Sequence, residues 1–220
     1  MMTATRILAV SPGGRTLPGE DEAASVLGGG GIAVYPTDTF YGLGGSAFSV
    51  EAAEAVYALK GRQRGKPLPV VVADLEMAAA AAADPPESFG RLAASLWPGP
   101  LSLVVRAGPG LPAAMLGPGG TVAMRVPALP WLRSLLRRCG FPLISSSANR
   151  SGAAEIDDSA EVRRLFQGSV DLIIDGGRTP GGAASTVVDL TKGEPVLLRP
   201  GAVPWDRILA ALAGRPHREG

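Results

Sequence analysis

Residues 32–45 read IAVYPTDTFYGLGG, an apolar run followed at once by hydroxyl, carboxylate and glycine residues. The apolar run 32–35 ends at Pro36, so we interpret it as a buried strand that feeds a loop. Short polar side chains at a strand end, followed by permissive glycines, are typical of a loop that binds a small ligand. A turn held by Asx and Ser/Thr side-chain caps explains the same residues equally well.

The segments around this strand predict the fold class. Strands are expected at 7–10, 32–35, 70–73, 101–105, 121–126, 142–145, 172–175, 186–190 and 196–199. Helices are expected at 20–27, 49–59, 78–83, 87–96, 131–138, 159–166 and 205–213. Because several strands follow strands directly, we expect an α+β (α/β-type) fold in which helices pack on a mixed, twisted sheet. We expect one domain over residues 1–220, with 214–220 as a flexible polar tail.

Composition excludes several classes of chemistry. The chain has one histidine, His217, and one cysteine, Cys139. A Ser-His-Asp or Cys-His nucleophile, a histidine general base and a His/Cys zinc site therefore lack their parts. An enzyme with this composition works through Lys, Arg, Ser, Thr, Asp and backbone amides, with a hard metal ion as the remaining option.

Charge and hydropathy set the expected location. Twenty-one basic residues against 20 acidic ones leave a net charge of +1, so no global field draws the protein to nucleic acid or an anionic membrane. We find no targeting or membrane-spanning segment in the sequence, and we expect a cytoplasmic protein with no membrane partner.

The strongest local signal is residues 60–66, KGRQRGK, in which four cations occupy seven positions. The lysines of this segment offer point charges, the arginines offer forked donors, and the two glycines let the backbone approach a ligand closely. These features together suit a triphosphate. A solvated basic turn is the alternative interpretation, and charge runs alone often have that explanation. No glycine-rich sequence ending in Gly-Lys-Ser/Thr is present, which disfavours a P-loop ATPase.

A second polar segment, residues 145–152, reads SSSANRSG and also follows an expected strand. Its hydroxyl and amide groups can donate to phosphate oxygens. Arg125 ends a strand just upstream, and 185–190 and 198–201 lie downstream. Strand ends that converge on one edge of a sheet are where open α/β folds bind ligands.

Together these segments form an ordered series of motifs. They are 36–44 (PTDTFYGLG), 60–62 (KGR), 66–68 (KPL), 97–101 (WPGPL), 125–127 (RVP), 147–152 (SANRSG), 185–189 (STVVD) and 198–201 (LRPG). The series resembles the YrdC/TsaC family of L-threonylcarbamoyladenylate synthases, over residues 32–201. The paired Lys-x-Arg and Ser-x-Asn elements are the family's signature, and the length resembles the family's short, single-domain form with a YrdC-like fold.

The resemblance implies a reaction in which ATP, bicarbonate and L-threonine give threonylcarbamoyl-AMP and pyrophosphate. A tRNA threonylcarbamoyl transferase complex would then use the product to form N6-threonylcarbamoyladenosine. The N-carboxy-threonine is itself the nucleophile, so the protein needs only to position substrates and neutralise charge. The resemblance places Thr39, Arg125, Ser145 and Ser185 at L-threonine and its carbamate. It places Lys60, Arg62, Lys66, Thr121, Ser147, Asn149, Glu155 and Arg199 at ATP.

Some expectations stay open at this point. Some family members have a histidine that contacts threonine where this chain has Val71, whose side chain offers only apolar contact. Mg²⁺ is expected to accompany ATP, and the sequence assigns no site for it. Two alternatives remain: an RNA-binding YrdC-like module, with weak tRNA contact, and a nucleotide-binding paralogue without synthase activity. The low net charge and an aromatic content of 5% weigh against tight independent RNA binding.

Overall fold

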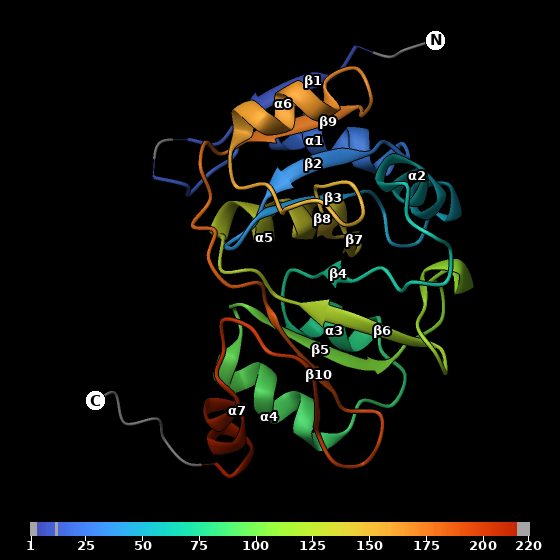
Figure 1. The fold of residues 1–220 in the computed structure, drawn as a ribbon, viewed down its shortest axis with the longest axis vertical. Helices are drawn as coiled ribbons and strands as arrows, with labels where there is room; N and C mark the ends of the chain where they lie inside the picture. Colours follow the sequence, from blue (N-terminus) through green and yellow to red (C-terminus); the bar gives the residue numbers. More distant parts are fainter. Residues whose placement is uncertain (1–3, 12, 215–220) are drawn as a thin grey trace.

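A computed structural model describes residues 4–11 and 13–214 of the chain. His217 and most of the expected tail, 215–220, lie outside these residues. In the described part, the strands form two mixed sheets, one above the other in Figure 1, with helices packed around them. The expected α+β class is confirmed, but the strands divide between two sheets instead of forming one.

The first sheet has five strands in the order β1-β9-β2-β3-β8. Their bounds are β1 Arg6–Ala9, β2 Ala33–Pro36, β3 Tyr41–Gly44, β8 Ser146–Ser147 and β9 Leu172–Asp175. β9 is parallel to β1 and β2, whereas β3 is antiparallel to β2 and β8. The expected strand 32–35 is therefore central and wholly buried, and the segment 37–40 is the loop of a hairpin.

The second sheet has six strands in the order β11-β10-β5-β6-β4-β7. Their bounds are β4 Val70–Val71, β5 Leu101–Arg106, β6 Thr121–Arg125, β7 Leu143–Ile144, β10 Thr186–Asp189 and β11 Val196–Arg199. β10 is parallel to β5 and β4 is parallel to β6, and the other pairs are antiparallel.

One of the three passages of the chain from one sheet to the other is at Ser145. The sequence predicted one strand over 142–145, but β7 ends at Ile144 in the six-stranded sheet and β8 begins at Ser146 in the five-stranded sheet. The Ser145 amide donates to the Pro69 carbonyl oxygen at 2.8 Å. Ser145 is thereby held between the two sheets, where both can contribute to a site.

The helices are α1 Glu20–Gly28, α2 Val50–Lys60, α3 Leu75–Ala80, α4 Glu87–Leu96, α5 Pro130–Cys139, α6 Ser159–Phe166 and α7 Trp205–Leu212, with a 3₁₀ turn η1 at Ala113–Met115. In Figure 1, α6 lies beside β1 and β9 of the five-stranded sheet, whereas α4 and α7 lie at the far end of the six-stranded sheet. α1 packs on α5, and α4 packs on α7. None of the helices in the described residues is long and apolar enough to span a bilayer.

One helix begins earlier than the alanine run predicted. We expected a helix over 78–83, but α3 covers Leu75–Ala80. The Asp74 side chain accepts from the Met77 amide at 3.1 Å and so caps the N-terminus of the helix. A side-chain cap that satisfies a free amide fixes the start of a helix better than alanine propensity does.

Candidate active site between the two sheets

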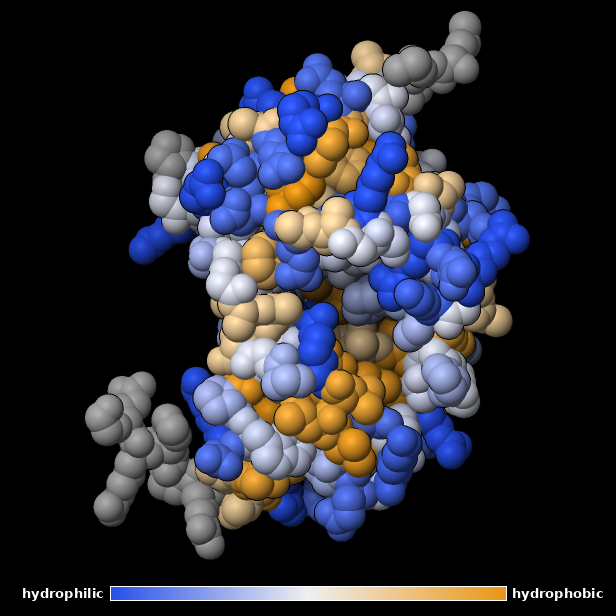
Figure 2. Space-filling view, in the orientation of Figure 1, coloured by the Kyte–Doolittle hydropathy of each residue, from blue (hydrophilic) through white to orange (hydrophobic). Residues whose placement is uncertain are grey.

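A cleft of about 590 Å³ opens between the two sheets. In Figure 2 this face is hollowed midway along the long axis, with hydrophobic side chains exposed along the lower margin. Nine of the twelve residues that the resemblance implied line it: Thr39, Arg62, Thr121, Arg125, Ser145, Ser147, Glu155, Ser185 and Arg199. These residues come from both sheets and their connecting loops, so the fold brings together positions up to 160 residues apart (199 − 39).

Arg125 is the most constrained cation of the cleft. It ends β6, is 8% exposed, and forms an ion pair through Nη2 with Asp38 Oδ1. Its Nε donates to the Gly99 carbonyl oxygen at 3.1 Å, and Nη1 donates to Thr39 Oγ1 at 3.4 Å. Backbone, carboxylate and hydroxyl acceptors on three sides fix the plane of the guanidinium, so its remaining N–H groups face a defined direction.

Ser185 and Arg199 form a second polar group in the cleft. The Ser185 hydroxyl lies 3.0 Å from that of Ser102, and it also accepts from Arg199 Nη2 at 3.0 Å. The Ser185 carbonyl oxygen accepts from Arg199 Nε at 3.1 Å and from Nη2 at 2.8 Å. These bonds join β11, β10 and β5 at the cleft, while Arg199 stays exposed and can turn toward an anion.

Arg62 lines the cleft with few partners. Nη2 donates to the Pro67 carbonyl oxygen at 3.2 Å, and Nη1 lies 3.4 Å from the Ser146 hydroxyl. Its Nε is buried and has no hydrogen-bond partner among the described residues. Burial lowers the pKa of the Arg62 side chain, because a charge out of water lacks hydration. No carboxylate pairs with it in the described part of the chain, so it presents an uncompensated positive charge.

Thr121, Ser147 and Glu155 complete the predicted lining. Thr121 begins β6, and its hydroxyl donates to the Pro118 carbonyl oxygen at 3.2 Å. The Ser147 hydroxyl donates to Asn149 Oδ1 at 2.6 Å. Glu155 lies on the connection between β8 and α6 and is partly buried.

Three predicted residues, Lys60, Lys66 and Asn149, do not line the cleft. Lys60 is 3% exposed, and its ammonium is bonded to oxygens of Ser147 and Asn149. Asn149 is also buried, and its Nδ2 donates to the Ala153 carbonyl oxygen at 2.6 Å. Lys66 is exposed beside Pro67, which is itself a lining residue.

Val71 is a wall of the cleft next to the fixed cation. It is 3% exposed, and on β4 it pairs in register with Arg125 on β6. Its side chain therefore offers an apolar surface beside the guanidinium, as the sequence predicted for a valine at this position.

Sequence reasoning missed two polar residues of this region. Asp38 was noted only as a carboxylate at a strand end, and its pairing with Arg125 spans 87 residues of sequence. Ser102 was placed on a strand without a role, although it lines the cleft. Alternation of polar and apolar residues along β5 was the available signal for Ser102, since Leu101 and Leu103 are fully buried beside it.

A metal site built from protein side chains does not fit the donor set found here. Among residues 4–11 and 13–214, no three His, Cys, Asp or Glu side chains lie together. The carboxylates in the cleft lining are Glu155 and Asp189, and Asp189 Oδ1 is already bonded to the amide and hydroxyl of Thr191 at 2.9 and 2.7 Å.

Comparison with known proteins supports the family implied by the motifs. Residues 25–201 match the model of the Sua5/YciO/YrdC family, which is described as "Telomere recombination". The threonylcarbamoyl-AMP synthase of Pyrococcus abyssi is 38% identical over 186 residues, covering 84% of this chain and 55% of that protein. A putative threonylcarbamoyl-AMP synthase of Mycobacterium tuberculosis is 37% identical over 190 residues, covering 86% of this chain and 87% of that protein.

Comparison with solved structures supports the same family. The crystal structure of P. abyssi Sua5 complexed with L-threonine matches with a TM-score of 0.88 and 35% identity, covering 97% of this chain and 63% of that one. Escherichia coli YciO matches with a TM-score of 0.83 and 26% identity, over 93% of this chain and 99% of that one. The chain thus spans about 55% of the length of the P. abyssi and Bacillus subtilis synthases that it resembles. The motif series, the two-sheet fold and the cleft agree with these matches, and the chain belongs to the Sua5/YciO/YrdC family.

Proposed function

We propose that this protein is an L-threonylcarbamoyladenylate synthase. The observation that carries the proposal is the cleft itself, which gathers three arginines in different surroundings and a set of hydroxyls, while no nucleophile–base pair lies among its lining residues. Such a site suits a reaction whose nucleophile belongs to the substrate. The relatives' shared name and the threonine complex of P. abyssi Sua5 support the same substrates.

The reaction has two steps. The amino group of L-threonine attacks bicarbonate, and water leaves to give N-carboxy-L-threonine. A carbamate oxygen then attacks the α-phosphorus of ATP, the bond to the β-phosphate oxygen breaks, and pyrophosphate leaves. The protein lowers the barrier by holding the two reactants in line and by balancing the negative charge on the phosphates.

At the amino-acid side, Arg125 holds the α-carboxylate of threonine. Its guanidinium is already oriented by Asp38 and Gly99, so little side-chain entropy is lost when the carboxylate binds. The hydroxyls of Thr39, Ser145 and Ser185 offer partners to the threonine hydroxyl and the carbamate. Val71 provides the apolar surface against which the threonine methyl packs.

At the nucleotide side, cations and hydroxyls hold the triphosphate: Arg62, Thr121, Ser147 and Arg199, with Lys66 at the mouth. Lys60 and Asn149 contribute through the loop that carries Ser147. Glu155 repels phosphate, so we assign it to a hydroxyl or amino donor of the nucleoside. Mg²⁺ would enter the cleft bound to the phosphate oxygens of ATP. The product would then pass to a tRNA threonylcarbamoyl transferase in the cytoplasm.

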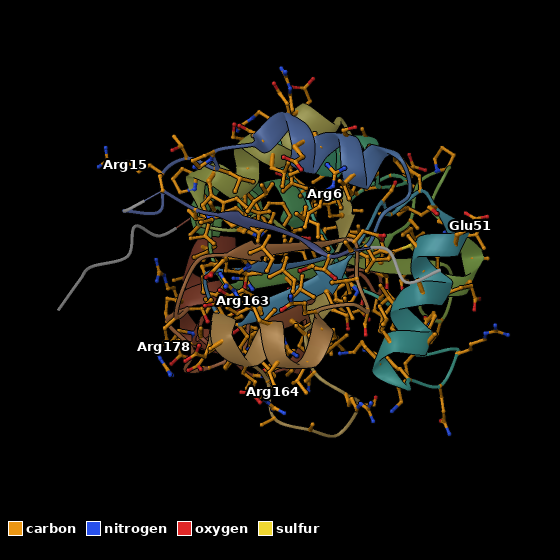
Figure 3. The ribbon with its side chains drawn as sticks, turned by 90° about the horizontal axis from the view of Figure 1, so that it is seen from above. Arg6, Arg15, Glu51, Arg163, Arg164 and Arg178 are labelled. Atoms are coloured by element: carbon orange, nitrogen blue, oxygen red, sulfur yellow. The ribbon has the colours of Figure 1, made fainter. Side chains whose placement is uncertain are left out.

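RNA binding as the main activity is less consistent with the surface. Figure 3 shows three arginines near α6, across the molecule from Glu51, and each of them pairs with a carboxylate. The pairs are Arg163 with Asp175, Arg164 with Glu161, and Arg178 with both Asp157 and Asp158. Paired arginines of this kind leave little free positive charge for a phosphate backbone.

The test is pyrophosphate release from ATP and ¹³C-bicarbonate, with and without L-threonine, together with mass spectrometry of the nucleotide product. We expect release that depends strictly on threonine and a ¹³C label in the adenylate. The Arg64→Ala variant should release pyrophosphate as the parent does. Arg64 belongs to the cation cluster 60–66, but it is exposed and lies outside the cleft. Release that is independent of threonine would contradict the proposal.

A further inference from the structure

Lys60, the first residue of the Lys-x-Arg element, ends α2 and points into the protein. Its Nζ donates to the Asn149 carbonyl oxygen at 2.8 Å, to Asn149 Oδ1 at 3.1 Å and to the Ser147 carbonyl oxygen at short range. A lysine ammonium has three N–H donors and no more. All three are therefore used within the loop that follows β8.

We propose that Lys60 is a positioning residue that ties the end of α2 to the loop 147–153, and that it does not bind the phosphates of ATP. The importance of this role rests on the proposed function, because the loop carries Ser147 of the nucleotide side. A phosphate could receive a bond from Lys60 only if one of the three loop oxygens lost its partner, and a buried oxygen without a partner is costly.

Further hydrogen bonds connect Lys60 and the loop 147–153. The Ser151 amide donates to the Lys60 carbonyl oxygen at 2.9 Å, so both the backbone and the side chain of Lys60 hold it. Asn149 Oδ1 also accepts from the Ser147 hydroxyl at 2.6 Å, and Asn149 Nδ2 donates to the Ala153 carbonyl oxygen at 2.6 Å. The ammonium is thus the centre of a small network, and the network sets where the Ser147 hydroxyl meets the cleft.

Gly61 explains why neighbouring cations have different roles. It caps the C-terminus of α2 with φ +56°, a left-handed conformation that glycine adopts without strain. The chain reverses there, so that Lys60 faces the loop while Arg62 faces the cleft. The Lys-x-Arg spacing therefore separates a structural cation from a ligand-binding one.

The electrostatics agree with a charged but internally satisfied lysine. Burial and, to a smaller extent, the nearby positive charge of Arg62 lower the pKa of Lys60 to about 8, although Glu155 acts in the opposite direction. The group is still mainly protonated at neutral pH, so all three donors are present.

The test compares the ligand-free parent with Lys60→Met by hydrogen–deuterium exchange and by limited trypsin digestion. We expect the amides of 148–151 to exchange about tenfold faster in the variant, because the loop opens locally. We also expect faster cleavage after the exposed Arg150, with exchange in α4 and α7 unchanged. Arg64→Met removes a charge from the same cluster without touching the loop, and it should behave as the parent does.

Parental exchange and cleavage in Lys60→Met, combined with weaker binding of inorganic triphosphate, would overturn the proposal. If Lys60→Met does not fold, Lys60→Arg decides. A planar guanidinium cannot converge on three oxygens as an ammonium does, so faster loop exchange is expected there, and parental exchange overturns the proposal. Because no substrate is present, these outcomes are independent of whether the protein proves to be a synthase.

Discussion

Arg125 and Arg62 both line the cleft, but their surroundings differ. The Arg125 region has a carboxylate partner in Asp38 and a backbone partner in Gly99, so its cation is neutralised and fixed. The Arg62 region has only weak or neutral partners, and among the described residues its buried Nε has no hydrogen bond and no carboxylate forms an ion pair with it. A fixed, neutralised cation suits one small carboxylate, whereas an uncompensated cation suits a polyanion that brings more negative charge.

The largest expected effect is the loss of Asp38. The Asp38→Ala substitution leaves the Arg125 charge buried without its partner, which should lower the free energy of unfolding by about 3–5 kcal/mol. The side chains of Asp38 and Arg125 are only 12% and 9% exposed, so water cannot replace the carboxylate well. Urea unfolding measures this directly.

The control for Asp38→Ala is an exposed pair of the same type. Glu161→Ala breaks the surface pair with Arg164 and should change the free energy of unfolding by about 0–1 kcal/mol. Equal, small effects for the two variants would show that the Arg125 region is not held by its ion pair.

A smaller effect concerns Lys60 and pH. The pKa of Lys60 is about 8 in the folded protein, against an ordinary value of 10.5 that applies to the unfolded chain. Between these two pH values the unfolded chain therefore binds more protons at this position than the folded protein does. The free energy of unfolding should then rise with pH, by roughly 2 kcal/mol between pH 7.5 and 9.5 from this group. Lys60→Met should lack this contribution. Urea unfolding of both proteins at the two pH values isolates it, because other titrating groups are common to both, and an equal pH dependence would refute it.

The smallest effect is expected at Cys139, at the end of α5 and away from the cleft. Cys139→Ala should leave synthase activity within a few-fold of the parent and cost about 1 kcal/mol of stability at most. Burial raises the pKa of the thiol to about 11, so alkylation at pH 8 should be slow in the folded protein and fast in urea. A large loss of activity in folded Cys139→Ala would show that the cleft needs a group outside its lining.

The same contrast between local and distant interactions explains what the sequence could predict. Helices were found where local caps mark them, as at Ser49, whose side chain accepts from the Ala52 amide. β3 was missed because its glycines resemble a loop. A Cβ at Gly44 would lie 1.7 Å from the Ile144 carbonyl oxygen, so this glycine is required by close packing between the sheets. That contact spans 100 residues (144 − 44) and leaves no local pattern.

The candidate site shows the same limit. The resemblance named most of the lining residues because motifs preserve residue types in order. It could not show that Lys60 is internally bonded or that Asp38 neutralises Arg125, since both facts depend on contacts across more than 80 residues. Division of the strands into two sheets was likewise hidden, because it depends on strand pairings distant in sequence and on three places at which the chain changes sheet, after β3, β7 and β9.

The most direct test of the two-region account is a crossed binding measurement. Calorimetric titrations of ATP alone, and of L-threonine in bicarbonate, are made on the parent, Arg62→Ala and Arg125→Lys, after their folding has been verified by circular dichroism. Arg62→Ala should weaken ATP binding by about 1.5–3 kcal/mol and change threonine binding little. Arg125→Lys should weaken threonine binding by about tenfold or more and change ATP binding little, because lysine cannot reproduce the oriented fork. Unchanged ATP affinity in Arg62→Ala, or equal weakening of both ligands by each variant, would contradict the account.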